Sequence, residues 1–308
     1  MSKANFPINP VLTGIVIAYR NRRMIADSVL PRAVVGAQEF KYWKYDLGQS
    51  FTVPKTQVGR TSRPNQVEFS AEELTSATLD FALDAPVPEA DIKNAPANYD
   101  PKGRAAEQTV NLIELDRELR AAKLVFNAAS YGAGLTKTLS GNDQWTHADG
   151  KPINVITEAL DSVIMRPNVM VLGRKAATAL RMNAQIIKAY NGSLSDSGLV
   201  PLEFIRELFE LEEILVGESL VNTVNQAKKP VLAQAWGNHC ALIYRDRLAD
   251  TRHGTTFGLT AQWGNREARE IIDEDMGMRG GYRIRVGESV KELITAPDLG
   301  FFLKDVAA

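Results

Sequence analysis

Two strand-like runs joined by a long polar segment constrain this chain more than any other feature. Residues 40–47 and residues 77–83 each place their side chains in two alternating sets, a period of two typical of strands with two distinct faces. The tip between them, around residues 54–64, has no acid and carries three basic side chains: Lys55, Arg60 and Arg63. A two-stranded ribbon of this length is at best marginally stable alone in water, so it needs a surface to lie on. A neighbouring subunit supplies one, and assembly is therefore our first hypothesis.

The net charge of the chain limits the kinds of molecule it is suited to bind. The 308 residues contain 36 Lys and Arg against 37 Asp and Glu, a formal net charge of −1. A dedicated nucleic-acid binder normally has a basic balance, so this composition argues against that class. The first 32 residues differ, because one acid, Asp27, stands against Lys3, Arg20, Arg22, Arg23 and Arg32. This arm either faces an anionic partner or is the solvated side of a short helix, and the sequence leaves both interpretations open.

Cysteine usage and hydropathy indicate the compartment. Cys240 is the only cysteine, which excludes an intrachain disulfide and a thiolate metal cluster within one chain. The N-terminus lacks a secretory pattern, and no apolar stretch approaches the length of a membrane helix. We therefore expect a soluble intracellular product without membrane contact.

The strongest helix signal covers residues 104–129, after a proline-marked connection at residues 85–101. At 1.5 Å per residue this helix would be roughly 35–40 Å long. One apolar stripe at helical spacing predicts the buried face: Leu112, Leu115, Leu119, Ala122 and Phe126. The charged side chains are predicted on the other faces: Glu114, Arg117, Glu118 and Arg120.

The remaining chain reads as a mixed α/β unit followed by two long strands. Its predicted helices begin near Asn154, cover 175–190 and begin again at Pro201, and its buried strands cover 169–172, 214–216 and 240–244. Two half-exposed strands follow at residues 257–263 and 282–286, linked by the charged stretch 265–281. The apolar run 301–303 is predicted to close a sheet.

No constellation of residues indicates catalysis. Gly132 and Gly134 resemble a nucleotide loop weakly, because they follow a helix and lack the third glycine. His239, Cys240 and His253 could supply metal ligands, but adjacent strand residues point to opposite faces, which favours a packed thiol beside a surface imidazole. The acidic run 273–275 is better explained as a solvated loop than as a cation site. We predict no catalytic residue, cofactor or metal.

With these elements in order, the chain resembles the major capsid proteins of tailed bacteriophages, whose fold herpesvirus shell floors and bacterial encapsulins share. It is most similar to the head proteins of Mu-like transposable phages, and the resemblance covers essentially the whole chain. Residues 282–287 (Tyr-Arg-Ile-Arg-Val-Gly) and 296–301 (Ala-Pro-Asp-Leu-Gly-Phe) resemble the usual capsid ending.

The resemblance implies an α+β fold with a defined division of the chain. Its implied parts are an N-terminal arm (1–38), an extended β-hairpin loop (39–84), a peripheral domain (85–152 and 251–290) with a long spine helix (104–129), and an axial domain with a mixed sheet (153–250 and 291–308). Residues 265–281 would lie near the three-fold axis of the shell.

The implied function is a structural shell protein that assembles into hexamers and pentamers of an icosahedral head around double-stranded DNA. The implied partners are further copies of the chain, a separate scaffold, a portal and a decoration protein, with assembly in the host bacterial cytoplasm. The inter-subunit contacts are predicted at Arg20, Arg22, Arg23, Trp43, Tyr45, Lys55, Arg60, Arg63 and Phe81. Some family members cross-link Lys to Asn, and Lys55 is a candidate donor for which no acceptor is identified.

Two alternatives remain. The same fold would serve an encapsulin, a cellular compartment that captures an enzyme cargo. A different class is an enzyme or small-ligand-binding domain built on residues 153–250.

Overall fold

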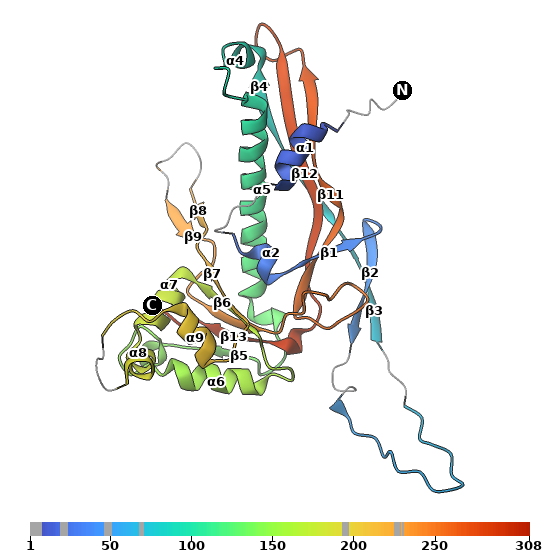
Figure 1. Cartoon of the computed structure of the whole chain (residues 1–308), viewed down its shortest axis with the longest axis vertical. Helices are drawn as coiled ribbons and strands as arrows, with labels where there is room; N and C mark the ends of the chain where they lie inside the picture. Colours follow the sequence, from blue (N-terminus) through green and yellow to red (C-terminus); the bar gives the residue numbers. More distant parts are fainter. Residues whose placement is uncertain are drawn as a thin grey trace.

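The computed structural model describes residues 8–18, 24–45, 51–67, 71–192, 197–224, 229 and 231–308. Two sheets form the framework, and the 25-residue helix α5 (Pro101–Val125) extends along one of them and reaches the other (Figure 1). This mixture of separate helices and largely antiparallel strands confirms the predicted α+β fold class.

The first sheet has four strands in the order β1-β11-β12-β4. Its strands are β1 (Arg32–Val35), β4 (Leu79–Pro88), β11 (Gly258–Asp273) and β12 (Gly281–Ile294). Helix α1 (Pro10–Ala18) and the first half of α5 pack on one face of this sheet. The prediction that residues 265–281 form a linker is wrong for residues 265–273, which continue β11, so that a short turn joins two long strands.

A β-bulge interrupts the long β11–β12 hairpin. The pairing register shifts between Trp263 and Glu267, and Gly264 has a φ of +68°. A residue with a side chain is strained in that left-handed region, which explains glycine at this position. The bulge lets the long strands bend as they pass from β1 to the turn beyond residue 273.

The second sheet has five strands in the order β5-β13-β10-β6-β7. Its strands are β5 (Thr136–Thr138), β6 (Val169–Gly173), β7 (Glu213–Gly217), β10 (Cys240–Ile243) and β13 (Gly300–Lys304). The buried strands predicted at 169–172, 214–216 and 240–244 and the closing run at 301–303 are confirmed. Strand β5 pairs in parallel with β13, although residues 85–152 were assigned to the other half of the molecule.

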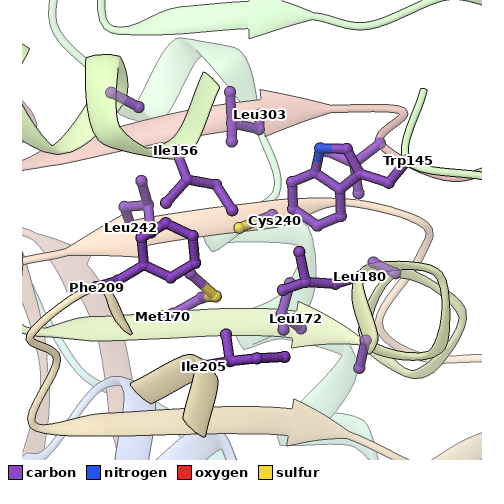
Figure 2. Close-up of a cluster of buried hydrophobic side chains, with 14 of the residues drawn as sticks. Trp145, Ile156, Met170, Leu172, Leu180, Ile205, Phe209, Cys240, Leu242 and Leu303 are labelled. Atoms are coloured by element: carbon purple, nitrogen blue, oxygen red, sulfur yellow. The ribbon is translucent and has the colours of Figure 1, made fainter. Parts of the chain in front are cut away.

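Helices cover both faces of the five-stranded sheet. One face packs against α6 (Pro152–Ser162), α7 (Arg174–Met182), α8 (Ala184–Asn191) and α9 (Leu202–Leu208). Figure 2 shows this core, in which Met170, Cys240 and Leu303 of the sheet meet Ile156, Leu180 and Ile205 of the helices. The other face packs against α2 (Ala26–Val29) and the last turns of α5. Smaller elements complete the described chain: α4 (Glu89–Lys93) and the 3-10 turns Ala128–Ser130, Gly141–Asp143 and Pro297–Leu299.

The predicted pairing of the ribbon is wrong. Strand β2 (Glu39–Tyr45) pairs antiparallel with β3 (Ala71–Ala77), from Glu39 opposite Ala77 to Tyr45 opposite Ala71. Residues 79–88 instead form β4 and pair with β12. Acidic side chains hide β3 in the sequence, but they face basic residues of β2: Lys41 forms an ion pair with Glu73, and Lys44 lies opposite Glu72.

Helix α5 is confirmed, but its predicted buried stripe is wrong in the first half, whereas Ala122 is buried and Phe126 partly buried near its end. The Asp100 side chain accepts a hydrogen bond from Lys102 N at 3.0 Å and caps the helix, and Pro101 occupies its first turn. The side chains of α5 that face the sheet are small or medium in size: Ala106, Val110 and Ile113. Leu112, by contrast, is 55% exposed. Both sets of residues have helical spacing. The set with smaller side chains faces the sheet, where it allows the strands to pack close to the helix.

One further difference concerns the second half of the chain. The predicted helix 175–190 is two helices, because Asn183 adopts an extended conformation (φ −69°, ψ 135°) and caps α8. Within the described residues, no helix combines the length and apolar character needed to cross a membrane.

Candidate assembly surfaces

The ribbon formed by β2 and β3 leaves the body of the molecule at the lower end of the four-stranded sheet (Figure 1). Residues 51–67 of its tip are exposed along their whole length. Four apolar side chains of the tip are exposed: Phe51, Val53, Val58 and Val67. Val53 is 91% exposed. Exposed apolar residues on a projection without a core of its own are typical of a contact surface for another chain.

The base of the ribbon is fixed to its own body. Phe40 is buried in a cluster with Ala33, Leu259 and Leu293. Trp43 N donates a hydrogen bond to Thr251 O at 3.2 Å, and the Trp43 ring remains 37% exposed. The ribbon therefore has an anchored root and a projecting tip.

The tip is basic and keeps its charges available. Lys55, Arg60 and Arg63 are exposed, and none of them pairs with an acid among the residues that the structure describes. The local hydrogen bonds use other groups: Asn65 Nδ2 donates to Lys55 O at 2.7 Å, and Ser62 N donates to Gly59 O at 3.0 Å. Three guanidinium or ammonium groups that pair with no acid among the described residues are suited to an acidic surface elsewhere.

Of the other predicted contact residues, Phe81 lies away from the ribbon. Phe81 lies on β4, where the Arg120 guanidinium sits 3.6 Å from the centre of its ring, a cation–π contact within the chain. Tyr45 contributes its backbone to β2, but its side chain is outside the described residues, as are Arg20, Arg22 and Arg23.

Sequence reasoning missed a second ribbon, formed by β8 (Leu220–Asn222) and β9 (Leu232–Gln234) beside the five-stranded sheet (Figure 1). Leu220, Val231 and Leu232 are exposed on it. Strands of three residues are too short for alternation to reveal them, so the apolar pair Val231-Leu232 was the one available signal.

A buried ionic network was also missed. Arg266 donates to Glu288 Oε2 at 3.2 Å and to Glu114 Oε1 at 2.8 Å, and Arg32 donates to Glu288 Oε2 at 2.8 Å. The Glu288 side chain is inaccessible to solvent. Burial disfavours its charged form, but Arg32 and Arg266 outweigh this effect and hold the pKa of Glu288 below its ordinary value.

The candidate metal ligands are kept apart. Cys240 points into the apolar core shown in Figure 2, where burial raises the pKa of its thiol far above the ordinary value. His239 packs its ring against Phe126 and Phe302 and accepts from Asp305 N at 2.9 Å. His253 is exposed beside Asp250. Among the described residues, no three His, Cys, Asp or Glu side chains are grouped to hold a metal ion.

Comparison with known proteins decides the family. A major capsid protein of Pseudomonas phage JBD67 is 63% identical over 308 residues, which cover all of both chains. The chain belongs to the family of phage major capsid proteins. The major capsid protein of Burkholderia phage BcepMu is 31% identical, over 97% of this chain and 96% of that protein. A family model described as phage major capsid protein E matches residues 128–236.

Solved structures agree on the fold of this capsid protein. A phage-related protein from Bordetella bronchiseptica RB50 has a TM-score of 0.77 at 21% identity and covers 98% of both chains. The SrpI encapsulin of Synechococcus elongatus PCC 7942 has a TM-score of 0.56 at 12% identity, over 99% of this chain and 92% of that one. The latter likeness shows a shared fold alone, so the encapsulin alternative has less support than the phage capsid.

The family confirms three predictions made from the sequence. The chain resembles Mu-like phage head proteins, it is a structural shell protein, and it is not an enzyme. Subunits of such shells associate with further copies of themselves. The surfaces described above are therefore candidates for contacts between copies of this chain.

Proposed function

We propose that this major capsid protein assembles, as hexamers and pentamers, into the icosahedral head that encloses double-stranded phage DNA. The observation that carries the proposal is the β2–β3 ribbon, with its anchored root and its exposed, basic and apolar tip. In closed symmetry each subunit uses the same contact many times, so modest contacts add up to a shell that is difficult to dismantle.

The ribbon tip lies across an adjacent subunit in this proposal. Its apolar side chains bury area there, and its basic side chains meet carboxylates. The proposed contact residues are Arg20, Arg22, Arg23, Trp43, Tyr45, Lys55, Arg60, Arg63 and Phe81. Of these, Phe81 has the weakest support, because Arg120 already covers its ring.

The division into arm, extended loop, peripheral domain and axial domain is part of the same proposal. The half built on the four-stranded sheet and most of α5 would be peripheral, and the half built on the five-stranded sheet would surround the symmetry axes. Strand β5 supports placing residues 136–138 with the axial half, since it pairs with β13.

The proposed partners follow from the shell. A separate scaffold would guide assembly in the host cytoplasm, a portal would occupy one vertex, and a decoration protein would bind the finished surface. The DNA contact would be non-specific, and a net charge of −1 would keep it weak, because the wall then has little electrostatic attraction for its genome.

Charge reversal at the tip tests the ribbon contact. In the variant Arg60→Glu with Arg63→Glu, we expect a sharp fall in the yield of particles, because the tip would repel the acidic surface it binds. Sedimentation and electron microscopy of the expressed protein, with its scaffold, give the measurement. The matched control is Arg60→Lys with Arg63→Lys, which keeps the charge and should still assemble. An unchanged particle yield and thermal stability after charge reversal would show that the tip does not make this contact.

A further inference from the structure

Glu118 is a buried carboxylate on α5 that accepts four hydrogen bonds. Oε1 accepts three of them, from Trp236 Nε1 at 2.6 Å, Ile25 N at 2.9 Å and Ser219 Oγ at 3.3 Å. Oε2 accepts one, from Ala26 N at 2.8 Å. The Glu118 side chain is fully buried, so without it these donors would be left without a hydrogen-bond partner inside the protein.

The four donors come from separate parts of the chain. Ile25 and Ala26 begin the short helix α2 of the N-terminal segment, Ser219 follows β7, and Trp236 follows β9. Glu118 therefore joins the N-terminal segment to the base of the β8–β9 ribbon through α5. Because the chain separations are 92 to 118 residues, this contact forms only in the folded molecule.

The unequal use of the two oxygens determines what a proton would do. A proton on Oε1 would compete with three donors, whereas a proton on Oε2 competes with the Ala26 N–H alone. The hydroxyl oxygen of a neutral carboxyl group is a much weaker acceptor than a carboxylate oxygen, so protonation at Oε2 weakens the bond from Ala26 N. The three bonds to Oε1 can persist, because a neutral carboxyl group still accepts through its carbonyl oxygen.

We propose that Glu118 is a proton-sensitive clasp, which holds the start of α2 against α5 when ionised and loosens its hold on Ala26 when protonated. This device is independent of the ribbon contact proposed above. Burial raises the pKa of Glu118, against the lowering effect of its donors, so the loosening occurs nearer to neutral pH than an ordinary glutamate would titrate. Since the folded chain takes up this proton more readily than an unfolded one, the opening is local and does not unfold the protein.

The charged groups around the clasp behave differently. Five of them line the same cavity as Glu118: Asp27, Arg32, Glu114, Arg117 and Arg266. Arg117 and Arg32 lower the pKa of Asp27 despite its burial, and Arg32 and Arg266 do the same for Glu288. Glu292 pairs with Arg120, and Glu218, next to Ser219, pairs with Arg174.

His239 is separated from Trp236 by the Phe126 ring, which contacts both side chains. Burial lowers the pKa of His239. Asp27 and Glu288 therefore stay charged when Glu118 takes up its proton.

Hydrogen exchange of the full chain, resolved to single amides and corrected for the intrinsic pH dependence, tests the clasp. As the pH falls through the titration of Glu118, we expect the protection of Ala26 to fall by about tenfold, the difference between a buried hydrogen bond to a charged acceptor and one to a neutral acceptor. The protection of Ile25 should change much less. This comparison uses the unaltered protein and does not depend on any variant folding. Equal changes at both amides, or no change at Ala26, would overturn the proposal.

Two variants sharpen the test. In Glu118→Gln the side-chain amide occupies the place of Oε2, so Ala26 should be poorly protected at every pH. Glu114→Gln is the matched control, because Glu114 lies one turn earlier on α5 and pairs with Arg266 without touching Ile25 or Ala26. This control should keep the pH profile of the unaltered chain. If Glu118→Gln kept that profile too, another group would be responsible and the proposal would be wrong.

Discussion

At the scale of single residues, the charges buried beside α5 are the least expected feature of this capsid protein. Glu288 receives hydrogen bonds from Arg32 and Arg266, which come from different strands. Breaking a buried pair by removing one partner is costly, because the remaining charge has lost both water and its counter-ion. We predict that Glu288→Ala destabilises the unassembled subunit by about 3–5 kcal/mol in chemical denaturation.

The matched control for that prediction is Glu158→Ala. Glu158 forms an exposed ion pair with Lys137, and surface pairs contribute at most about 1 kcal/mol. A loss of stability at Glu288 no greater than at Glu158 would show that the buried network is not a stabilising one.

Acid should remove the contribution of Glu288. Its pKa in the folded protein is lower than the ordinary value of 4.5, because the two guanidinium groups outweigh the cost of burial. A carboxyl group of this kind stabilises the fold above its unfolded pKa, and the stabilisation is lost as the pH falls through the folded value. We therefore predict that the stability difference between the unaltered chain and Glu288→Gln is constant near neutral pH and shrinks below about pH 4.5. Urea titrations at several pH values provide the measurement, and a difference that grows in acid would contradict the assignment.

The sequence could not reveal which charges are buried beside α5. Arg117 and Glu118 look like the solvated side of an amphipathic helix, and the predicted leucine stripe is equally regular. The partners that make their burial possible are Asp27, Thr260 and Trp236, which lie 90 to 143 residues away in the chain. Helical periodicity predicted one apolar face on α5, but a second regular set of apolar residues faces the sheet, and periodicity alone cannot say which set a sheet will cover.

At the scale of elements, local sequence signals predicted which helices and strands exist better than they predicted where each one begins and ends. The periodic run from residue 104 identified α5, although the helix begins at Pro101, which was assigned to the preceding connection. Continuous apolar runs identified β6, β7 and β10. Strand β3 was missed because Glu72 and Glu73 lower its strand propensity, and the lysines of β2 that balance them are known only from the pairing. Ribbon residues 77–83 were assigned to the wrong partner for the same reason.

Asn183 illustrates an element boundary that the sequence does contain. Its side chain accepts from Gln185 N at 2.9 Å and so caps α8. Its Nδ2 group donates to Trp145 O at 3.1 Å and to Gly150 O at 3.2 Å. The residue is buried, so these groups have no access to water. One asparagine therefore ends one helix, starts the next and holds a loop.

We predict that Asn183→Ala lowers the stability of the subunit by about 2–4 kcal/mol, the loss of a cap combined with two unsatisfied buried carbonyls. Asn183→Ser separates the two effects, since its hydroxyl oxygen can still cap the helix but it lacks the Nδ2 donor that reaches both carbonyls. Chemical denaturation should place it between the alanine variant and the unaltered chain. Equal stability of Asn183→Ala and the unaltered chain would mean that solvent replaces these bonds at no cost.

At the scale of the whole molecule, the order of elements was enough to identify the family, although several pairings were wrong. The long-range partners β4 and β12 are about 200 residues apart in the chain, so local patterns could not specify their register. Assembly was nevertheless predictable, because the tip has no acid and no core whichever strand it pairs with. That the tip needs another surface follows from its amino-acid composition, which is known without a structure.

The last prediction concerns the projecting tip as a unit. Its root is held by Phe40 in an apolar cluster and by the hydrogen bond of Trp43 to Thr251, whereas residues 51–67 are exposed throughout. Replacing residues 51–67 with a Gly/Ser segment of the same length should leave the stability of the subunit within about 0.5 kcal/mol, as expected for surface changes. The same replacement should abolish particles, because the contact surface is gone while the fold remains. Sedimentation velocity distinguishes shells from single subunits. A control that changes only Thr56, Gln57, Thr61 and Gln66 to Ser keeps the apolar and basic groups and should assemble. Particles of normal yield from the Gly/Ser variant would place the essential contacts elsewhere on the subunit.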